Sequence, residues 1–160
     1  MNAHQAIQLS MEMGSYIAMT YIADLSDADL LKRPAPNCNH INWQLGHCIL
    51  SEHNDVDKQV PGVMPALPPS FAEKYSKETA ASDDASKFCT KAELIETFQA
   101  QRAGTMQAFA KVSDADFDRP SGVEYAPNVG AVFALQGSHY LMHVGQWAVV
   151  RRQLGHKPLF

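Results

Sequence analysis

Residues 129–154 contain no proline, and this run constrains the fold more than any other part of the sequence. Its apolar residues recur at intervals of three and four, which is the spacing of a helix that buries one face. His139 and His143 are four residues apart, so a helix places both imidazoles on one side, one turn apart. The same stripe contains Val132 and Val150. We therefore predict a long helix with both histidines turned toward the core.

A histidine pair on a buried helical face is what one helix can offer a divalent transition metal. A catalytic zinc site usually takes three protein ligands and leaves a fourth position for water or substrate, so a third ligand is expected elsewhere. Residues 39–60 form another helical segment, in which Trp43, His47, Leu50 and Asn54 follow the same spacing. His47 is the predicted third ligand. From spacing alone, three hydrogen-bonded core histidines are the alternative interpretation.

Several polar residues lie near these histidines in sequence. Gln44 and Gln136 each precede one histidine by three residues, so each is either a partner that accepts a ring N–H or a polar residue at a helix boundary. Gln146 is a candidate for hydrogen bonding to a metal-bound water or a substrate, and the alternative is that it satisfies a backbone or solvent group. Arg151 is a candidate for binding a carboxylate, although a cation in the last turn of a helix also complements the helix dipole.

Other reactive side chains are predicted to lie outside the site. Glu52 and Asp55 are off the histidine face and are interpreted as solvated charges. His40 begins the second helix, where solvent is expected to reach it, and His40 and His4 are the evident candidates for a fourth ligand. Cys48 is predicted to be a packed core thiol, because adjacent residues on a helix point about 100° apart.

Four helical segments are predicted, at residues 3–24, 39–60, 91–112 and 129–154. The sequence Ser-Asp-Ala-Asp occurs at Ser26 and again at Ser113, each time after one helix and before a histidine-bearing one. This similarity suggests two related helical hairpins, and the alternative is a common way to cap a turn. With no strand signal, we predict one all-α domain over residues 1–160, a four-helix bundle.

A long loop is predicted between the second and third helices. Residues 61–90 contain four prolines and few apolar residues, apart from Phe71, Tyr75 and Phe88. A helical turn is expected near Phe71. A loop of this length in a compact domain serves either as a lid or binding segment or as a docked connector.

The amino-acid composition and net charge exclude several classes of protein. Hydrophobic residues make up 46% and charged residues 19%, as in folded globular proteins. The net charge of −4 gives no basic surface for nucleic acid, and no stretch approaches the roughly 20 apolar residues that span a bilayer. The first residues lack the pattern of a signal peptide, and the three cysteines are irregularly spaced, so we predict reduced thiols and a cytoplasmic protein.

Two segments together resemble the DinB-like superfamily. The first is Asn-Trp-Gln-Leu-Gly-His ending at His47, preceded by Asp-Leu-Ser-Asp-Ala-Asp-Leu from Asp24. The second is His139-x-x-x-His143-x-x-Gln146, followed by Arg-Arg-x-Leu-Gly ending at residue 155. The resemblance implies an up-down-down-up four-helix bundle in which His47, His139 and His143 bind a divalent metal, commonly zinc or nickel.

The same resemblance implies a range of functions. The best-understood relatives are transferases and isomerases that use mycothiol, bacillithiol or related low-molecular-weight thiols, and many are homodimers. We therefore expect a metal-dependent thiol S-transferase or isomerase with a small-molecule substrate, with metal-dependent hydrolysis as the nearest alternative. A non-catalytic metal-binding or stress-response bundle is a second hypothesis, and a metal-free interaction module is a third.

Overall fold

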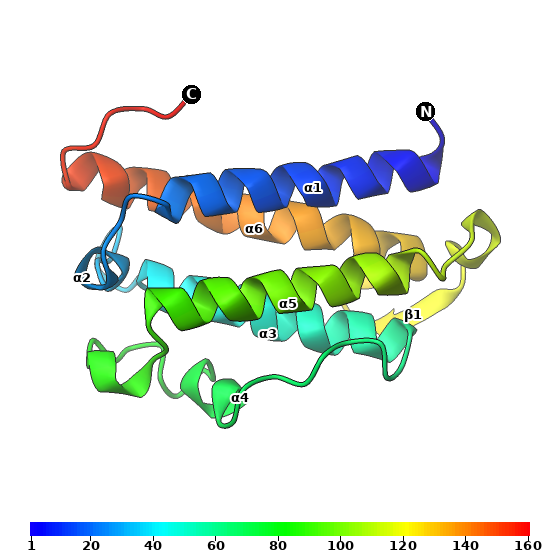
Figure 1. The fold of residues 1–160 in the computed structure, drawn as a ribbon, viewed down its shortest axis with the longest axis horizontal. Helices are drawn as coiled ribbons and strands as arrows, with labels where there is room; N and C mark the ends of the chain where they lie inside the picture. Colours follow the sequence, from blue (N-terminus) through cyan, green and yellow to red (C-terminus); the bar gives the residue numbers. More distant parts are fainter.

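The computed structural model describes residues 1–160, and most of them are helical. Four long helices lie side by side with roughly parallel axes, as Figure 1 shows. They are α1 (Ala3–Ile22), α3 (Ile41–Gln59), α5 (Lys91–Phe109) and α6 (Val129–Gln153). α1 packs along α6, and α3 contacts both α5 and α6. The four predicted helical segments are confirmed, and each boundary lies within one helical turn of its predicted position.

The four long helices run in two directions. In Figure 1, α1 and α6 run one way, and α3 and α5 run the opposite way. None of the helices has both the length and the apolar character that crossing a membrane requires. The interior between the helices is mostly apolar, and Cys48 is fully buried there, as predicted.

The expected absence of strands is wrong at one place. β1 (Pro120–Val123) and β2 (Ala126–Asn128) form an antiparallel hairpin just before α6. These strands are only four and three residues long, which is too short to produce a period-two pattern in the sequence. Their hairpin is important because its turn carries Tyr125 toward α3.

Short capped helices follow α1 and α5. Ser26 begins α2 (Asp27–Leu30), and Ser113 begins the 3₁₀ helix η2 (Asp114–Asp116). Each serine forms a capping box with the aspartate three residues later, and Thr90 forms one with Glu93 at the start of α5. The two matched sequences therefore occupy equivalent places, although the second forms the tighter helix.

Residues 61–90 dock on α3 through aromatic side chains. They contain one helical turn, α4 (Phe71–Lys74), at the predicted place, and the 3₁₀ helix η1 (Ala85–Lys87). Phe71, Tyr75 and Phe88 are buried. A Cβ atom at Gly46 would lie 2.2 Å from the Tyr75 ring, so glycine is required for the ring to rest on the backbone of α3.

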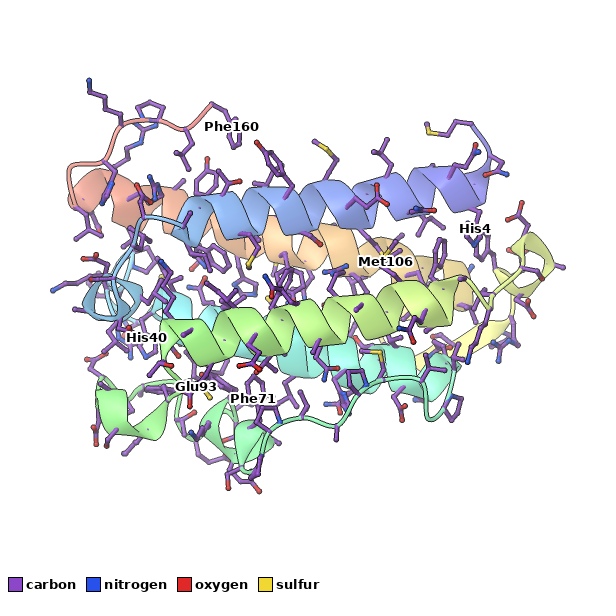
Figure 2. All side chains as sticks on the ribbon, viewed as in Figure 1. His4, His40, Phe71, Glu93, Met106 and Phe160 are labelled. Carbon is purple, nitrogen blue, oxygen red and sulfur yellow. The ribbon has the colours of Figure 1, made fainter.

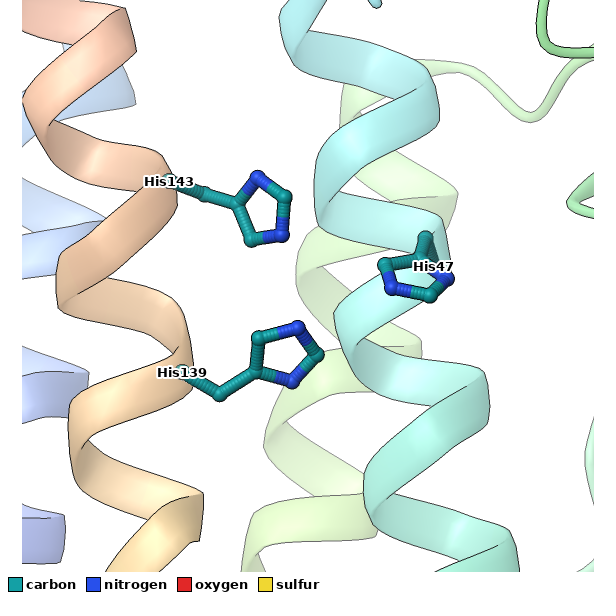
Figure 3. A group of neighbouring side chains, drawn as sticks. All are labelled: His47, His139 and His143. Carbon is teal, nitrogen blue, oxygen red and sulfur yellow. The ribbon is translucent and has the colours of Figure 1, made fainter. Parts of the chain in front are cut away.

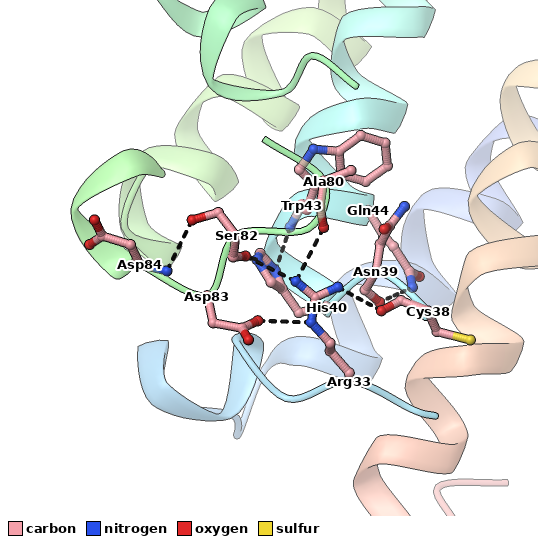
Figure 4. A network of polar contacts seen from close by, with 10 residues as sticks. All are labelled: Arg33, Cys38, Asn39, His40, Trp43, Gln44, Ala80, Ser82, Asp83 and Asp84. Carbon is pink, nitrogen blue, oxygen red and sulfur yellow. Dashed lines mark hydrogen bonds and ion pairs between the residues drawn. The ribbon is translucent and has the colours of Figure 1, made fainter. Parts of the chain in front are cut away.

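Arg33, in the region before α3, binds residues 80–83 near the end of this segment (Figure 4). Its guanidinium donates to the carbonyls of Cys38, Ala80 and Ser82 and forms an ion pair with Asp83 at 2.8 Å. The bonds to Ala80, Ser82 and Asp83 join parts of the chain that are about 50 residues apart. The segment is therefore held as a docked connector at this end.

The contact between α1 and α6 depends on glycine. A Cβ atom at Gly137 would lie 2.4 Å from the Ser10 carbonyl oxygen, and one at Gly14 would lie 2.7 Å from the Gly137 carbonyl oxygen. We expect Gly137→Ala to lower the free energy of unfolding by about 1–3 kcal/mol, because backbone must move to admit the methyl group. Urea denaturation followed by circular dichroism measures this change.

Gly145→Ala is the matched control on the same helix, because no heavy atom lies within 4 Å of its added Cβ. Alanine is the better helix former, so this variant should gain about 0.5–1 kcal/mol. Similar destabilisation of both variants would contradict the close contact of α1 with α6.

Candidate metal centre

The three predicted histidines converge between α3 and α6 (Figure 3). His139 and His143 project from α6, and His47 faces them from α3. The ring centroids are 5.3 Å apart for His47 and His139, 5.8 Å for His47 and His143, and 5.1 Å for His139 and His143. One ligand atom of each lies within 4.8 Å of the others. Ligand atoms around a tetrahedral zinc lie about 3.4 Å apart, so small side-chain rotations bring these rings to metal-binding distance.

The chemistry of the three imidazoles fits a divalent metal. Nε2 of His143 is buried and has no hydrogen-bond partner, although buried polar atoms normally have one. Burial, together with the neighbouring imidazoles, lowers the pKa of His139 and of His143 to about 4. Burial also lowers the pKa of His47, and the charge of Lys77 adds to this effect. All three rings are therefore neutral near pH 7, which is the form that binds metal.

Gln44 determines which nitrogen of His143 carries the proton. The indole N–H of Trp147 can only donate, and it donates to Gln44 Oε1 at 2.8 Å, whereas Nε2 of Gln44 donates to Gln146 at 2.9 Å and to the Asn39 carbonyl. Gln44 Oε1 also lies 3.2 Å from Nδ1 of His143. Because this oxygen can only accept, Nδ1 carries the proton, and the lone pair lies on the unpartnered Nε2.

Gln44→Leu should weaken metal binding by about 10- to 100-fold, because the ring of His143 loses the acceptor that fixes its tautomer. A competition titration of the metal-free protein with zinc and a chromophoric chelator measures this change. Gln153→Leu, which removes a glutamine bonded only to the Pro34 carbonyl, is the control and should bind as the unsubstituted protein does. Equal zinc affinities of the unsubstituted protein and both variants would show that Gln44 does not contribute to metal binding.

The remaining polar candidates have other partners. The side chain of Gln136 donates to a carbonyl of its own helix and has no hydrogen bond to a histidine ring, so the first of its two interpretations, a partner of the ring N–H, is not observed. Gln146 contributes its oxygen to Gln44. Arg151 is 3% exposed and binds Asp24 and the Tyr21 carbonyl, which accounts for its position at the end of α6 without a ligand.

The prediction that Glu52 and Asp55 are solvated is wrong. Glu52 is fully buried, where it pairs with Arg102 and accepts hydrogen bonds from Thr105 and Tyr140. Asp55 is 7% exposed, and burial raises the pKa of its carboxyl group. All the side-chain partners of Glu52, and Tyr125 at Asp55, come from distant parts of the chain, which is why the pattern of α3 alone misplaced both carboxylates.

Neither of the candidate fourth ligands joins the cluster, and Figure 2 places His4 and His40 at opposite ends of the molecule. His4 stacks on Phe109 at 4.0 Å. The prediction that solvent reaches His40 is wrong, because its ring is fully buried. His40 is the N-cap of α3: its Nδ1 accepts from the Trp43 backbone N–H at 3.0 Å, and its Nε2 donates to the Ser82 carbonyl at 3.2 Å.

This cap makes the stability of the fold depend on pH. Burial, with the nearby Arg33 charge, lowers the pKa of His40 from 6.5 to about 4. Between those values the unfolded chain takes up a proton that the folded chain does not, so stability falls as the pH falls from 6.5 toward 4. In His40→Asn, where asparagine caps without titrating, urea denaturation from pH 7.5 to 4.5 should show a smaller loss. An equally steep loss in this variant would contradict the role of His40.

A cleft opens beside the cluster. A cavity of about 320 Å³ is lined by His47, Ser51, Tyr125, Leu135 and His139. Residues 61–90 do not line it, so the hairpin and not the long loop borders the cleft. A larger cavity of about 430 Å³ lies between α5 and the long loop, but none of the histidines lines it. The potential metal ligands, and not the cavity volume, therefore identify the candidate site.

The long loop supports the site through Trp43. The indole of Trp43 stacks on the His47 ring with centroids 5.0 Å apart, and its N–H donates to Ser76 and Thr79 of the loop. Sequence reasoning missed this role, although the four-residue spacing of Trp43 and His47 was a signal for it. Trp147 of α6 is fully buried, where it packs and also orients Gln44.

The fold and the histidine cluster together define a mainly helical protein with a candidate divalent-metal centre between two of its helices. The sequence model of the DinB superfamily matches residues 17–147, a range that contains all three histidines. The chain belongs to the DinB superfamily, as its two sequence segments indicated.

No curated protein matches the chain. A solved structure, the "conserved protein of locus from Enterococcus faecalis", is similar with a TM-score of 0.71 and 15% sequence identity, over 97% of this chain and 99% of that one. This similarity concerns the fold alone.

Proposed function

We propose that this protein is a metal-dependent thiol S-transferase or isomerase that acts on a small electrophile, built on the up-down-down-up four-helix bundle. The observation that carries the proposal is the set of three neutral, inward-facing imidazoles with no fourth protein donor, beside a cleft of about 320 Å³. A structural zinc site is closed by four protein ligands, whereas a catalytic site keeps one position for substrate.

A zinc or nickel ion bound by these rings would supply a Lewis acid that lowers the pKa of a thiol. The protein's own residues prepare the ligands: Gln44 presents the lone pair of His143, and Trp43 holds the ring of His47 by stacking. In the transfer reaction, the thiol gives up its proton to solvent and its sulfur bonds to the electrophilic carbon. The leaving group departs with the electron pair of the broken bond.

Thiol transfer is favoured over hydrolysis because no carboxylate belongs to the histidine cluster. Glu52, the first acidic residue after His47, is committed to Arg102 in the core. A metal hydrolase of the His-Glu-x-x-His type has its general base between the paired histidines, and Tyr-Leu-Met stands between His139 and His143.

The test begins with elemental analysis of protein purified without an affinity tag. About one zinc or nickel per chain is expected. Metal-loaded protein is then assayed for thiol consumption with mycothiol, bacillithiol and glutathione against an activated aryl halide and an epoxide. Activity should disappear on chelation and return when metal is restored. A folded protein that takes up no metal contradicts the proposal, and stoichiometric metal without turnover for any pair supports the non-catalytic alternative.

A further inference from the structure

One wall of the cleft contains Ser51 and Tyr125, and both are bonded to Asp55 behind the wall. The proposed reaction gives these three residues no role. Ser51 lies one helical turn after His47 on α3, and Asp55 lies one turn further. The Tyr125 hydroxyl donates to the Asp55 carboxylate, 2.9 Å and 3.1 Å from its two oxygens. The Ser51 hydroxyl donates to the same carboxylate at 3.3 Å. This group therefore begins directly beside a candidate metal ligand.

The direction of these hydrogen bonds determines which hydrogen-bonding groups the wall of the cleft offers to a ligand. A hydroxyl has one hydrogen to donate and two lone pairs that accept. Because Asp55 takes both hydrogens, Ser51 and Tyr125 present only acceptor oxygens to the cleft. Asp55 itself does not line the cleft, but its buried charge lies immediately behind these two oxygens.

The charged side chain directly behind the wall is the carboxylate of Asp55. None of the five residues that line the cleft is a lysine or an arginine. Lys58, the cation that acts on Asp55, is exposed and donates to the Gly122 carbonyl. Exposed charges are screened by salt much more than buried ones, so the potential of Asp55 is little reduced at the wall. The wall therefore favours hydrogen-bond donors and positive charge in the part of a ligand that lies against it and disfavours anionic groups there, whereas a metal ion bound by the histidines would attract a thiolate.

We infer that the cleft selects small molecules that carry a hydrogen-bond donor or a positive charge close to the reacting atom. Asp55 and Tyr125 determine this specificity, with Asp55 acting through the hydroxyls that it orients. The inference rests on the proposed function, because it concerns the ligand of the same metal centre. A ligand with a carboxylate or phosphate close to its reacting atom binds less tightly. Its anionic group would lie against the acceptor oxygens of Ser51 and Tyr125, with the negative charge of Asp55 directly behind them.

Three thiols of similar size test this specificity: cysteamine is cationic, 2-mercaptoethanol is neutral and 3-mercaptopropionate is anionic. Each is titrated at pH 7.5 into cobalt-loaded protein, and the thiolate-to-cobalt absorption band measures the Kd. In Asp55→Asn, cysteamine should bind more weakly and 3-mercaptopropionate more tightly, so that the ratio of their Kd values shifts by about tenfold. Because each thiol is compared with itself across variants, differences in thiol acidity cancel.

Two further variants make the test decisive. Glu124→Gln removes an exposed negative charge next to Tyr125 but outside the cleft, and it should leave the ratio unchanged. Tyr125→Phe, at a position that is 64% exposed and so tolerates substitution, removes one acceptor and should weaken cysteamine binding by about threefold. The Tyr125 variant decides the question if Asp55→Asn does not fold, as judged by circular dichroism.

The outcomes separate this inference from the proposed function. If cobalt binds and the thiols bind, but the ratio is the same in Asp55→Asn and the unsubstituted protein, only the specificity inference is overturned. An equal shift in Glu124→Gln also overturns it, because the effect would then be a general one of net charge. If no thiol gives an absorption band, the proposed function fails, and this inference fails with it.

Discussion

Substitution of His143 by alanine is expected to weaken zinc binding by about 100- to 1,000-fold. Structural zinc sites bind with roughly 10–16 kcal/mol over four ligands, so each ligand contributes about 2.5–4 kcal/mol, which corresponds to a factor of this order. His143 is the most buried of the three histidines, and its Nε2 has no other partner. Competition titration with a chromophoric chelator and metal analysis after dialysis measure the loss.

His53→Ala is the control, because His53 lies on α3 like His47 but outside the cluster, where it bonds to Gln101. This variant should retain one metal per chain at unchanged affinity. His47→Ala and His139→Ala should lose metal as His143→Ala does, since each removes one of three ligands. If any of these three variants still binds zinc as tightly as the His53 variant does, the metal binds elsewhere.

The long helices could be predicted from the sequence because their signals are local. The apolar spacing of residues 129–154 and the capping box at Thr90 are both contained within one element. The histidine cluster could be predicted because the spacing of its histidines is also a signal within single helices. His139 and His143 share a helical face at any register of packing, and His47 lies on a stripe of the second helix between Trp43 and Leu50.

The surroundings of the cluster could not be predicted, because they depend on contacts between distant parts of the chain. Asp55 is covered by Tyr125, which is 70 residues later in a hairpin without a strand signal. Gln44 follows the sequence pattern of a partner for His47 but bonds to His143 on the facing helix. Residue types and intervals along one helix do not determine which side chains meet across two helices.

A second large effect is expected in the core, where Arg102→Met should lower the free energy of unfolding by about 3–5 kcal/mol. Arg102 lies 3.2 Å from the Glu52 carboxylate, and its guanidinium is 5.1 Å from the centre of the Tyr140 ring. Methionine removes the positive charge and leaves the carboxylate buried with only the hydroxyls of Thr105 and Tyr140. Urea denaturation of the metal-free protein measures the change, since bound metal would mask part of it.

The double variant Glu52→Gln with Arg102→Met separates the charge from the packing. If the cost comes from an uncompensated buried carboxylate, the double variant should be more stable than Arg102→Met, because it buries no charge. Glu96→Gln, an exposed change on α5, should stay within about 0.5 kcal/mol of the unsubstituted protein. Equal losses in the single and double variants would mean that the arginine acts through its contact with the aromatic rings. A stable double variant with weakened metal binding would mean that the ion pair positions α3 against α6, since Tyr140, bonded to Glu52, adjoins His139.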